Sequence, residues 1–165
     1  MTKFLVAVAA AVVLLSPLSS NAQTPAPPPA YGPGISLDDA KKMLVAAEAE
    51  AKKNGWLMAI AVVDSGGKLV AFSRMDNTQL VSIDIAVGKA VTANNFKRPT
   101  KLLQEGLAAG GTSLRILAVP GVTPIDGGLP IVVAGKIVGA IGVSGAAANQ
   151  DAEVAMAGLA AVTAK

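Results

Sequence analysis

Two strand-turn-strand patterns constrain the fold of this chain more than any other feature. Leu57 to Asp64 is an apolar run rich in β-branched residues, and the turn sequence Ser-Gly-Gly-Lys separates it from a second run over Leu69 to Ser73. Leu129 to Ala134 and Ile137 to Val143 repeat the pattern around Gly135-Lys136. Because tight turns join antiparallel neighbours, the sequence predicts two β-hairpins in a sheet that is at least partly antiparallel.

Helical periodicity fills the segments around the hairpins. Between Leu37 and Asn54 apolar residues recur every three or four positions, with Ser36 as a good N-cap, Asp39 as its capping-box partner and Gly55 placed to end the helix. The same spacing predicts helices over about 80–95 and 150–162, and Pro99 opens a short helix through Gln104 that Gly106 stops. Asn149 is a candidate cap for the last helix.

The region between the hairpins is predicted to contain one further strand, over Leu114 to Val119. The elements then follow the order α-β-β-α-α-β-β-β-α, an α/β (α+β) pattern of one antiparallel sheet packed with helices. The last helix carries apolar or small residues on every face, from Val154 to Val162. Such a helix is usually buried all round, either between the sheet and a loop or against a second subunit, and we expect a homo-oligomer.

The N-terminus has the pattern of a secretory signal. Lys3 precedes an apolar run from Phe4 to Leu15, and Ser20-Asn21-Ala22 is typical of a cleavage site. We therefore expect a signal peptide over residues 1–22, a proline-rich flexible spacer over 23–35 and one domain over 36–165. The expected location is periplasmic or secreted, with no membrane attachment after cleavage.

The chain has neither cysteine nor histidine. No disulfide can form, and Ser-His-Asp, Cys-dependent or His-dependent catalysis is excluded. Ser144 lies in a Gly-Val-Ser-Gly string that resembles part of a nucleophile elbow, yet it has no histidine to activate it, and Gly139, Gly142 and Gly145 have the wrong spacing for a dinucleotide fingerprint. The 14 basic residues are scattered among 11 acidic ones, so a nucleic-acid partner is not indicated.

The carboxylates do not by themselves define a metal site. Aspartate is common at strand ends and helix starts because it stabilises turns and caps helices, so each of these carboxylates taken singly is explained by a structural role. Together the carboxylates would suit a hard cation such as ferric iron. The residues concerned are Asp64, Asp76, Asp84, Asp126 and Asp151. Lys89 is either a surface charge or a lysine turned towards an anionic ligand.

A set of strings in fixed order resembles the GlcG/HbpS haem-binding family, which is related to the C-terminal domain of PduO-type proteins. The strings are Ala61-Val62-Val63-Asp64 with Gly67 and Leu69-Val70, Arg74-Met75-Asp76, Lys89-Ala90 with Thr92-Ala93, Gly127 to Ile131, Val138 to Gly145, and Gln150-Asp151. The resemblance covers about 36–162. It implies a profilin-like domain, assembly into oligomers, and binding of haem or a related tetrapyrrole in some members.

The resemblance makes haem the first candidate ligand of an exported binding protein that scavenges, senses or stores it. Arg74, Lys89 and Arg98 are candidates for the propionates, and Phe96 and the loop from Thr123 to Pro130 for the ring face. The complete set of predicted ligand-binding residues is Arg74, Lys89, Thr92, Phe96, Arg98, Thr123, Gly127, Gly128 and Pro130. Without histidine, the candidates for the iron ligand are Thr100, Thr112, Thr123 and Met75, followed by Thr92, Met58, Lys89 and Tyr31.

Two other functions stay open on the sequence. One is an enzyme acting on a small polar metabolite through Lys89 with Asp84 or Asp126. The other is an oligomeric interaction module without a ligand, in which the glycine strings serve packing only.

Overall fold

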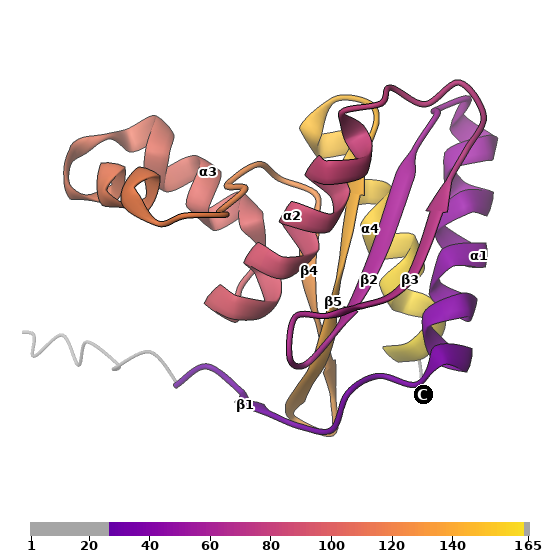
Figure 1. Ribbon diagram of the computed structural model, residues 1–165, viewed down its shortest axis with the longest axis horizontal. Helices are drawn as coiled ribbons and strands as arrows, with labels where there is room; N and C mark the ends of the chain where they lie inside the picture. The colour runs from indigo at the N-terminus through magenta and orange to yellow at the C-terminus, as the bar shows by residue number, and fades with distance from the viewer. Residues whose placement is uncertain (1–26, 164–165) are drawn as a thin grey trace, which may run out of the picture.

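The computed structural model describes residues 27–163 and shows a sheet with helices on both faces (Figure 1). The predicted signal peptide and the start of the spacer lie outside this range. The elements are β1 (Ala30–Tyr31), α1 (Leu37–Asn54), β2 (Ala59–Asp64), β3 (Leu69–Arg74), α2 (Ser82–Phe96), α3 (Thr100–Ala109), the 3₁₀ helix η1 (Gly111–Ala118), β4 (Gly128–Val133), β5 (Lys136–Ser144) and α4 (Ala148–Thr163).

Both predicted hairpins are present, and they pair with each other through β2 and β5. These two strands run antiparallel, with Ala61 opposite Gly142, while β3 and β4 pair with their outer edges. The short β1 runs parallel to the first residues of β5, with Tyr31 opposite Ile137. The end of the predicted spacer is thus attached to the domain, where the Tyr31 hydroxyl also donates a 2.9 Å hydrogen bond to the carbonyl of Asn94.

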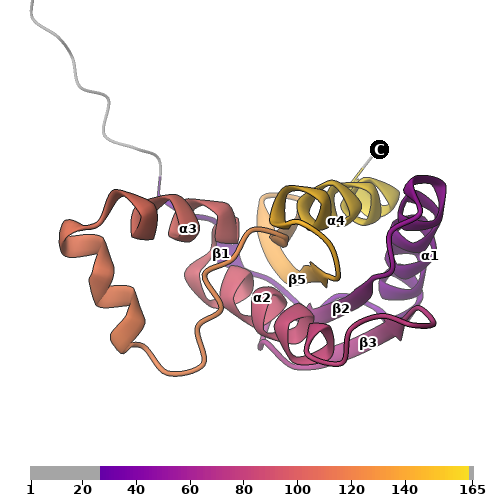
Figure 2. The ribbon, with the colours of Figure 1, turned by 90° about the horizontal axis from the view of Figure 1, so that it is seen from above.

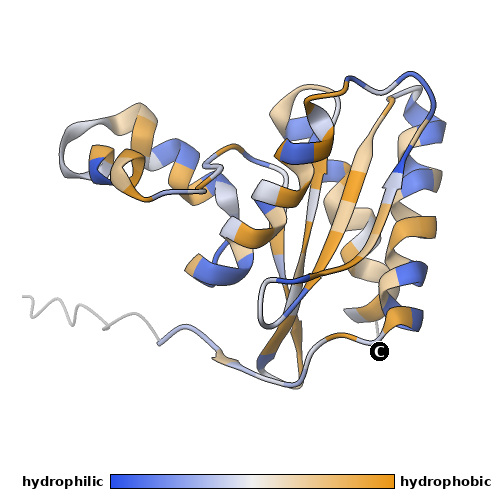
Figure 3. Ribbon diagram, in the orientation of Figure 1, coloured by the Kyte–Doolittle hydropathy of each residue, from blue (hydrophilic) through white to orange (hydrophobic). Residues whose placement is uncertain are grey.

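Alternate residues of β2 face two separate cores. Ile60 and Val62 pack with α1 and α4, whereas Ala59, Ala61 and Val63 pack with α2. Figure 2 shows α1 and α4 together on one side of the sheet and α2 on the other, and Figure 3 shows the strands between them as predominantly apolar. Burial on both faces explains why the sequence of β2 is continuously apolar rather than alternating.

The α2 helix lies unusually close to the sheet because its contact face is made of alanines. Ala86, Ala90 and Ala93 are fully buried there. A Cβ at Gly142 of β5 would lie 2.1 Å from the carbonyl oxygen of Ala86, so only glycine fits beneath the helix. Because α2 lies this close to the sheet, its side chains reach the end of β5, where the candidate site lies.

The segment from Thr100 to Ala118, here called the arm, projects away from the sheet (Figures 1 and 2). Thr100 ties its base to β4: the Thr100 hydroxyl accepts a 2.9 Å hydrogen bond from the Gly128 amide. Gln104 accepts another, also of 2.9 Å, from the Asp126 amide.

The arm is where the sequence prediction fails most. The strand predicted over 114–119 is part of the 3₁₀ helix η1, and α3 continues past Gly106 to Ala109. The segment from Leu114 to Leu117 includes Arg115 and pairs with no strand of the sheet; it packs beside α3 instead. Apart from this segment and β1, the predicted order of elements is confirmed.

The predictions for the outer helices are confirmed at both ends of α1 and wrong for α4. Ser36 caps α1 by accepting a 3.1 Å hydrogen bond from the Asp39 amide, and Gly55 ends the helix in the left-handed region. Asn149, however, lies inside α4 rather than capping it. This helix is not buried all round either, since Met156 is 55% exposed while Val154 and Ala155 face the core.

Candidate functional site

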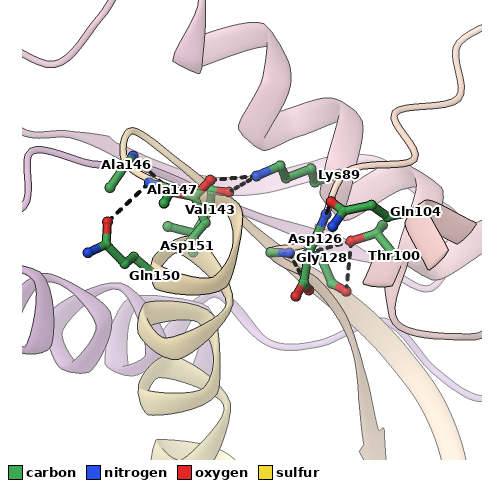
Figure 4. Close-up of polar contacts among 11 residues, drawn as sticks. Lys89, Thr100, Gln104, Asp126, Gly128, Val143, Ala146, Ala147, Gln150 and Asp151 are labelled. Atoms are coloured by element: carbon green, nitrogen blue, oxygen red, sulfur yellow. Dashed lines mark hydrogen bonds and ion pairs between the residues drawn. The ribbon is translucent and has the colours of Figure 1, made fainter. Parts of the chain in front are cut away.

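A buried ion pair joins α2 to the start of α4. The Lys89 ammonium donates a 2.7 Å hydrogen bond to Asp151 Oδ2 and a second of 2.9 Å to the carbonyl oxygen of Val143 (Figure 4). The two side chains are 1% and 4% exposed. Burying two opposite charges is costly unless both are paired, which this geometry achieves for each of them.

The surrounding backbone is shaped to admit the Lys89 side chain. Gly127 has a φ of +116°, and a Cβ there would lie 2.9 Å from Lys89 Nζ and 2.8 Å from the Cβ of Asp151. Asp151 is held in turn by its second oxygen, which accepts a 3.0 Å hydrogen bond from the Ala146 amide ahead of α4. Gly127 therefore makes room for the ion pair, and Gly128 makes room for the Lys89 backbone and the Thr100 side chain.

Burial opposes the charged form of both partners. It lowers the pKa of Lys89, against the opposing effect of the hydrogen bond and charge of Asp151. It raises the pKa of Asp151, against the opposing effects of Lys89 and the backbone amides of Ala146 and Gly145. Perturbed pairs of this kind occur at functional sites and also in structural ion-pair networks.

Asp151 is a partner that the sequence analysis did not assign to Lys89. The enzyme hypothesis paired Lys89 with Asp84 or Asp126, whereas its direct ion-pair partner is Asp151. Asp84 is exposed; Asp126 accepts a 2.7 Å hydrogen bond from the Gly127 amide, and its charge also raises the pKa of Lys89. Lys89 and Asp151 are 62 residues apart, so no local spacing indicates their contact.

A different pocket lies between the end of α2 and the arm, here called the arm pocket. It has a volume of about 270 Å³. Phe96, Leu102, Leu103 and Ile116 supply apolar surface, Arg98 and Arg115 supply positive charge, and Gly106 and Ser113 complete the lining. Arg115 was missed in the sequence analysis because its segment was predicted as a strand.

Arg74 lies elsewhere, at the end of β3. With Met75, Asp76, Glu48 and Lys52 it lines a pocket of about 420 Å³ beside α1. The structure therefore separates the predicted propionate ligands Arg74, Lys89 and Arg98 into three different places.

The predicted threonine ligands differ in availability. Thr100 is fully buried and hydrogen-bonded to Gly128, and Thr92 is buried with its hydroxyl accepting a 2.9 Å hydrogen bond from the Thr123 amide. The Thr123 side chain packs against Gly88, and Pro130 is half-buried in β4. Thr112 is exposed at the start of η1, next to Ser113 of the arm pocket.

The part of the chain that the structure describes contains neither a cluster of metal ligands nor a membrane-spanning helix. No three His, Cys, Asp or Glu side chains in residues 27–163 are grouped as a metal site would require, so the five aspartates do not form one there. Asp64 instead stabilises its own turn by accepting 2.9 Å hydrogen bonds from the amides of Gly66 and Lys68. In the same range no helix is long and apolar enough to cross a membrane.

Comparison with known proteins identifies the family. Residues 35–160 match the family described as haem degrading protein HbpS-like. The chain belongs to the HbpS-like family. It is also 44% identical over 110 residues to the protein GlcG of Escherichia coli K12, a match that spans 67% of this chain and 81% of GlcG.

Solved structures confirm the fold of this HbpS-like chain. HbpS itself superposes with a TM-score of 0.74 at 32% identity, covering 79% of this chain and 92% of HbpS. A structure of the PduOC:haem complex superposes with a TM-score of 0.72 at 27% identity, covering 78% of this chain and 95% of PduOC. The predicted GlcG/HbpS membership is thus confirmed, and haem binding is supported at the level of the family.

Proposed function

We propose that this HbpS-like protein is exported and binds haem or a related tetrapyrrole in the arm pocket. The observation that carries the proposal is the combination of four apolar side chains with two guanidinium groups, Arg98 and Arg115, around one pocket. An apolar wall suits the porphyrin face, and arginine pairs well with carboxylates such as the propionates.

The arm pocket fits this ligand better than the pocket at Arg74. The latter is larger, but the carboxylates Glu48 and Asp76 line it together with Lys52 and Arg74, and these carboxylates would repel the haem propionates. The proposal therefore retains Phe96 and Arg98 of the predicted ligand-binding residues and replaces Arg74 and Lys89 with Arg115.

The iron would receive at most a weak ligand in this pocket. The chain has no histidine or cysteine, and of the predicted ligands only Thr112 is both exposed and adjacent to the pocket lining. We assign Thr112 as the candidate iron ligand, in a five-coordinate or loosely six-coordinate complex. Most of the affinity would then come from the apolar wall and the arginines.

We also propose that the protein forms an oligomer in which a second copy of the chain packs against the arm. Leu102, Leu114 and Leu117 are 53%, 48% and 69% exposed on the arm. At about 270 Å³ the pocket is also at the small end of the range for organic ligands, so one protomer would leave much of a haem uncovered. Light scattering should show an oligomer that Leu117→Glu dissociates, whereas Val45→Glu on α1 leaves it intact.

The proposal that the protein is exported rests on the signal-peptide pattern of residues 1–22. Mass spectrometry of the protein recovered from outside the cytoplasm should give an N-terminus at Gln23. Recovery of the full chain from the cytoplasm alone would refute this part of the proposal.

Haem binding is tested by titrating haemin into the purified protein while following the Soret band, with albumin as the comparison for nonspecific uptake. A saturable, stoichiometric shift is expected. Uptake no better than that of albumin would contradict haem binding and leave a small-metabolite ligand or a ligand-free interaction module.

A further inference from the structure

A second, smaller pocket lies over the Lys89–Asp151 pair. It has a volume of about 170 Å³ and is lined by residues from the first turns of α2 and α4 and from the end of β5. It shares no lining residue with the arm pocket. Haem is far too large for it, so any ligand it holds is of a different kind.

Two nearly buried hydroxyl groups line this pocket without a protein partner. Ser82 is 2% exposed and Ser144 is 5% exposed, and neither side chain makes a hydrogen bond within residues 27–163. Neither hydroxyl oxygen is sealed from the pocket, so both are available to bond a molecule that lies in it.

Lys89 adds a third donor. Its ammonium has three N–H groups, of which one is directed to Asp151 and one to the carbonyl oxygen of Val143. The remaining N–H has no acceptor within the described residues. A purely structural ion pair would require neither this spare donor nor the two free hydroxyls beside it.

The donors and the charge favour a small anion. The first residues of α2 and α4, Ser82 and Ala148, both line the pocket, and helix N-termini carry partial positive charge. The ion pair itself is neutral overall, and the Asp151 carboxylate would repel a doubly charged ligand. These features fit a monoanion better than a phosphate, whose charge is about −1.5 to −2 at neutral pH.

Size and wall chemistry narrow the class further. A volume near 170 Å³ equals that of about five or six water molecules at roughly 30 Å³ each. Ile85 and Ile125 give the pocket an apolar side that suits a short alkyl chain. We propose that this pocket binds a short-chain monocarboxylate of about four to six non-hydrogen atoms, held by Ser82, Ser144 and Lys89.

Acetate and propionate are suitable probes, with inorganic phosphate for comparison. Binding is measured on the haem-free protein by saturation-transfer NMR of the ligand and by calorimetry, so the result is independent of whether haem binds in the arm pocket. Saturable binding of a carboxylate in or below the millimolar range is expected, with phosphate at least tenfold weaker.

Variants of single serines test whether the carboxylate binds in the pocket over the Lys89–Asp151 pair. Ser82→Ala and Ser144→Ala should each weaken carboxylate binding about fivefold while leaving the thermal midpoint near that of the wild type. Ser113→Ala removes a hydroxyl from the arm pocket instead and should leave carboxylate binding unchanged. Ala148→Leu adds bulk at the pocket and should abolish binding even if one serine variant fails to fold.

Three outcomes would overturn the proposal. They are the absence of saturable binding by either carboxylate, binding of phosphate as tight as that of acetate, and wild-type affinity in all folded pocket variants.

Discussion

Lys89 on α2 and Asp151 on α4 form a 2.7 Å ion pair whose side chains are 1% and 4% exposed. The same pair fixes the carbonyl of Val143 at the end of β5, so three elements meet at one charge. Lys42 and Asp39 lie at the same 2.7 Å distance on α1, but their side chains are 63% and 44% exposed. The two pairs differ in burial and not in distance.

Lys89→Met should lower the free energy of unfolding by about 3–5 kcal/mol, because it leaves the Asp151 carboxyl buried without its partner. Urea unfolding followed by far-UV circular dichroism measures this. Lys42→Met is the matched control, and its unfolding midpoint should stay near that of the wild type because water screens the exposed pair. Equal midpoints for the two variants would show that the buried pair does not hold α2 to α4.

The double variant Lys89→Met with Asp151→Asn should be close to wild type in stability at pH 7. Burial lowers the pKa of Lys89 and raises that of Asp151. The Lys89 contribution is fully present only above its unfolded pKa of about 10.4 and is lost as the pH falls through its lowered folded value. The Asp151 contribution is fully present only below about pH 3.9 and is lost as the pH rises through its raised folded value.

Near neutral pH the pair is therefore least favourable to folding. The free energy of unfolding of the wild type, minus that of the double variant, should rise between pH 7 and pH 10, because the folded protein loses the Lys89 proton in this range while the unfolded chain still holds it. Urea titrations at the two pH values measure the difference. A constant or falling difference would contradict the assigned direction of the Lys89 shift.

Gly142→Ala should destabilise the protein by at least about 3 kcal/mol, because its Cβ would lie 2.1 Å from the backbone oxygen of Ala86 and neither backbone can move freely. Gly106→Ala on the arm is the matched control. Its nearest neighbour would be Ser113 at an ordinary 3.5 Å, and alanine favours a helix by up to about 1 kcal/mol over glycine. Thermal unfolding of both variants tests whether the close contact of α2 with β5 limits stability.

The parts of the fold predicted from the sequence are those whose signals are local. Ser36, Gly55 and the turn residues around Gly67 and Gly135 mark the ends of their elements by their own conformational preferences. The pairing of the two hairpins through β2 and β5 and the burial of β2 on both faces were not predicted, because they depend on contacts between residues distant in the sequence. The strand predicted over 114–119 is wrong because a short, largely apolar segment fits a strand as well as a short helix, and periodicity alone does not decide between them.

The candidate sites depended on contacts between distant residues, and the sequence indicated them only in part. Lys89 was singled out, but its partner Asp151 comes from another helix and was named only among the five aspartates and in a family string. Phe96 and Arg98 are two residues apart and do line one pocket, whereas Arg115 reaches that pocket only because η1 folds back beside α3. Arg74 belongs to a family string, but it lies at the end of β3 and lines a different pocket.

Arg98→Glu and Arg74→Glu together test the central claim, that haem binds in the arm pocket. Both side chains are exposed, both changes reverse one charge, and each residue lines a different pocket. The measurement is the dissociation constant of haemin for each variant, from the Soret titration at one salt concentration. Arg98→Glu should raise it about tenfold or more, which corresponds to roughly 1.4 kcal/mol, and Arg74→Glu should leave it within about twofold of wild type. A larger loss for Arg74→Glu than for Arg98→Glu would contradict the arm-pocket assignment.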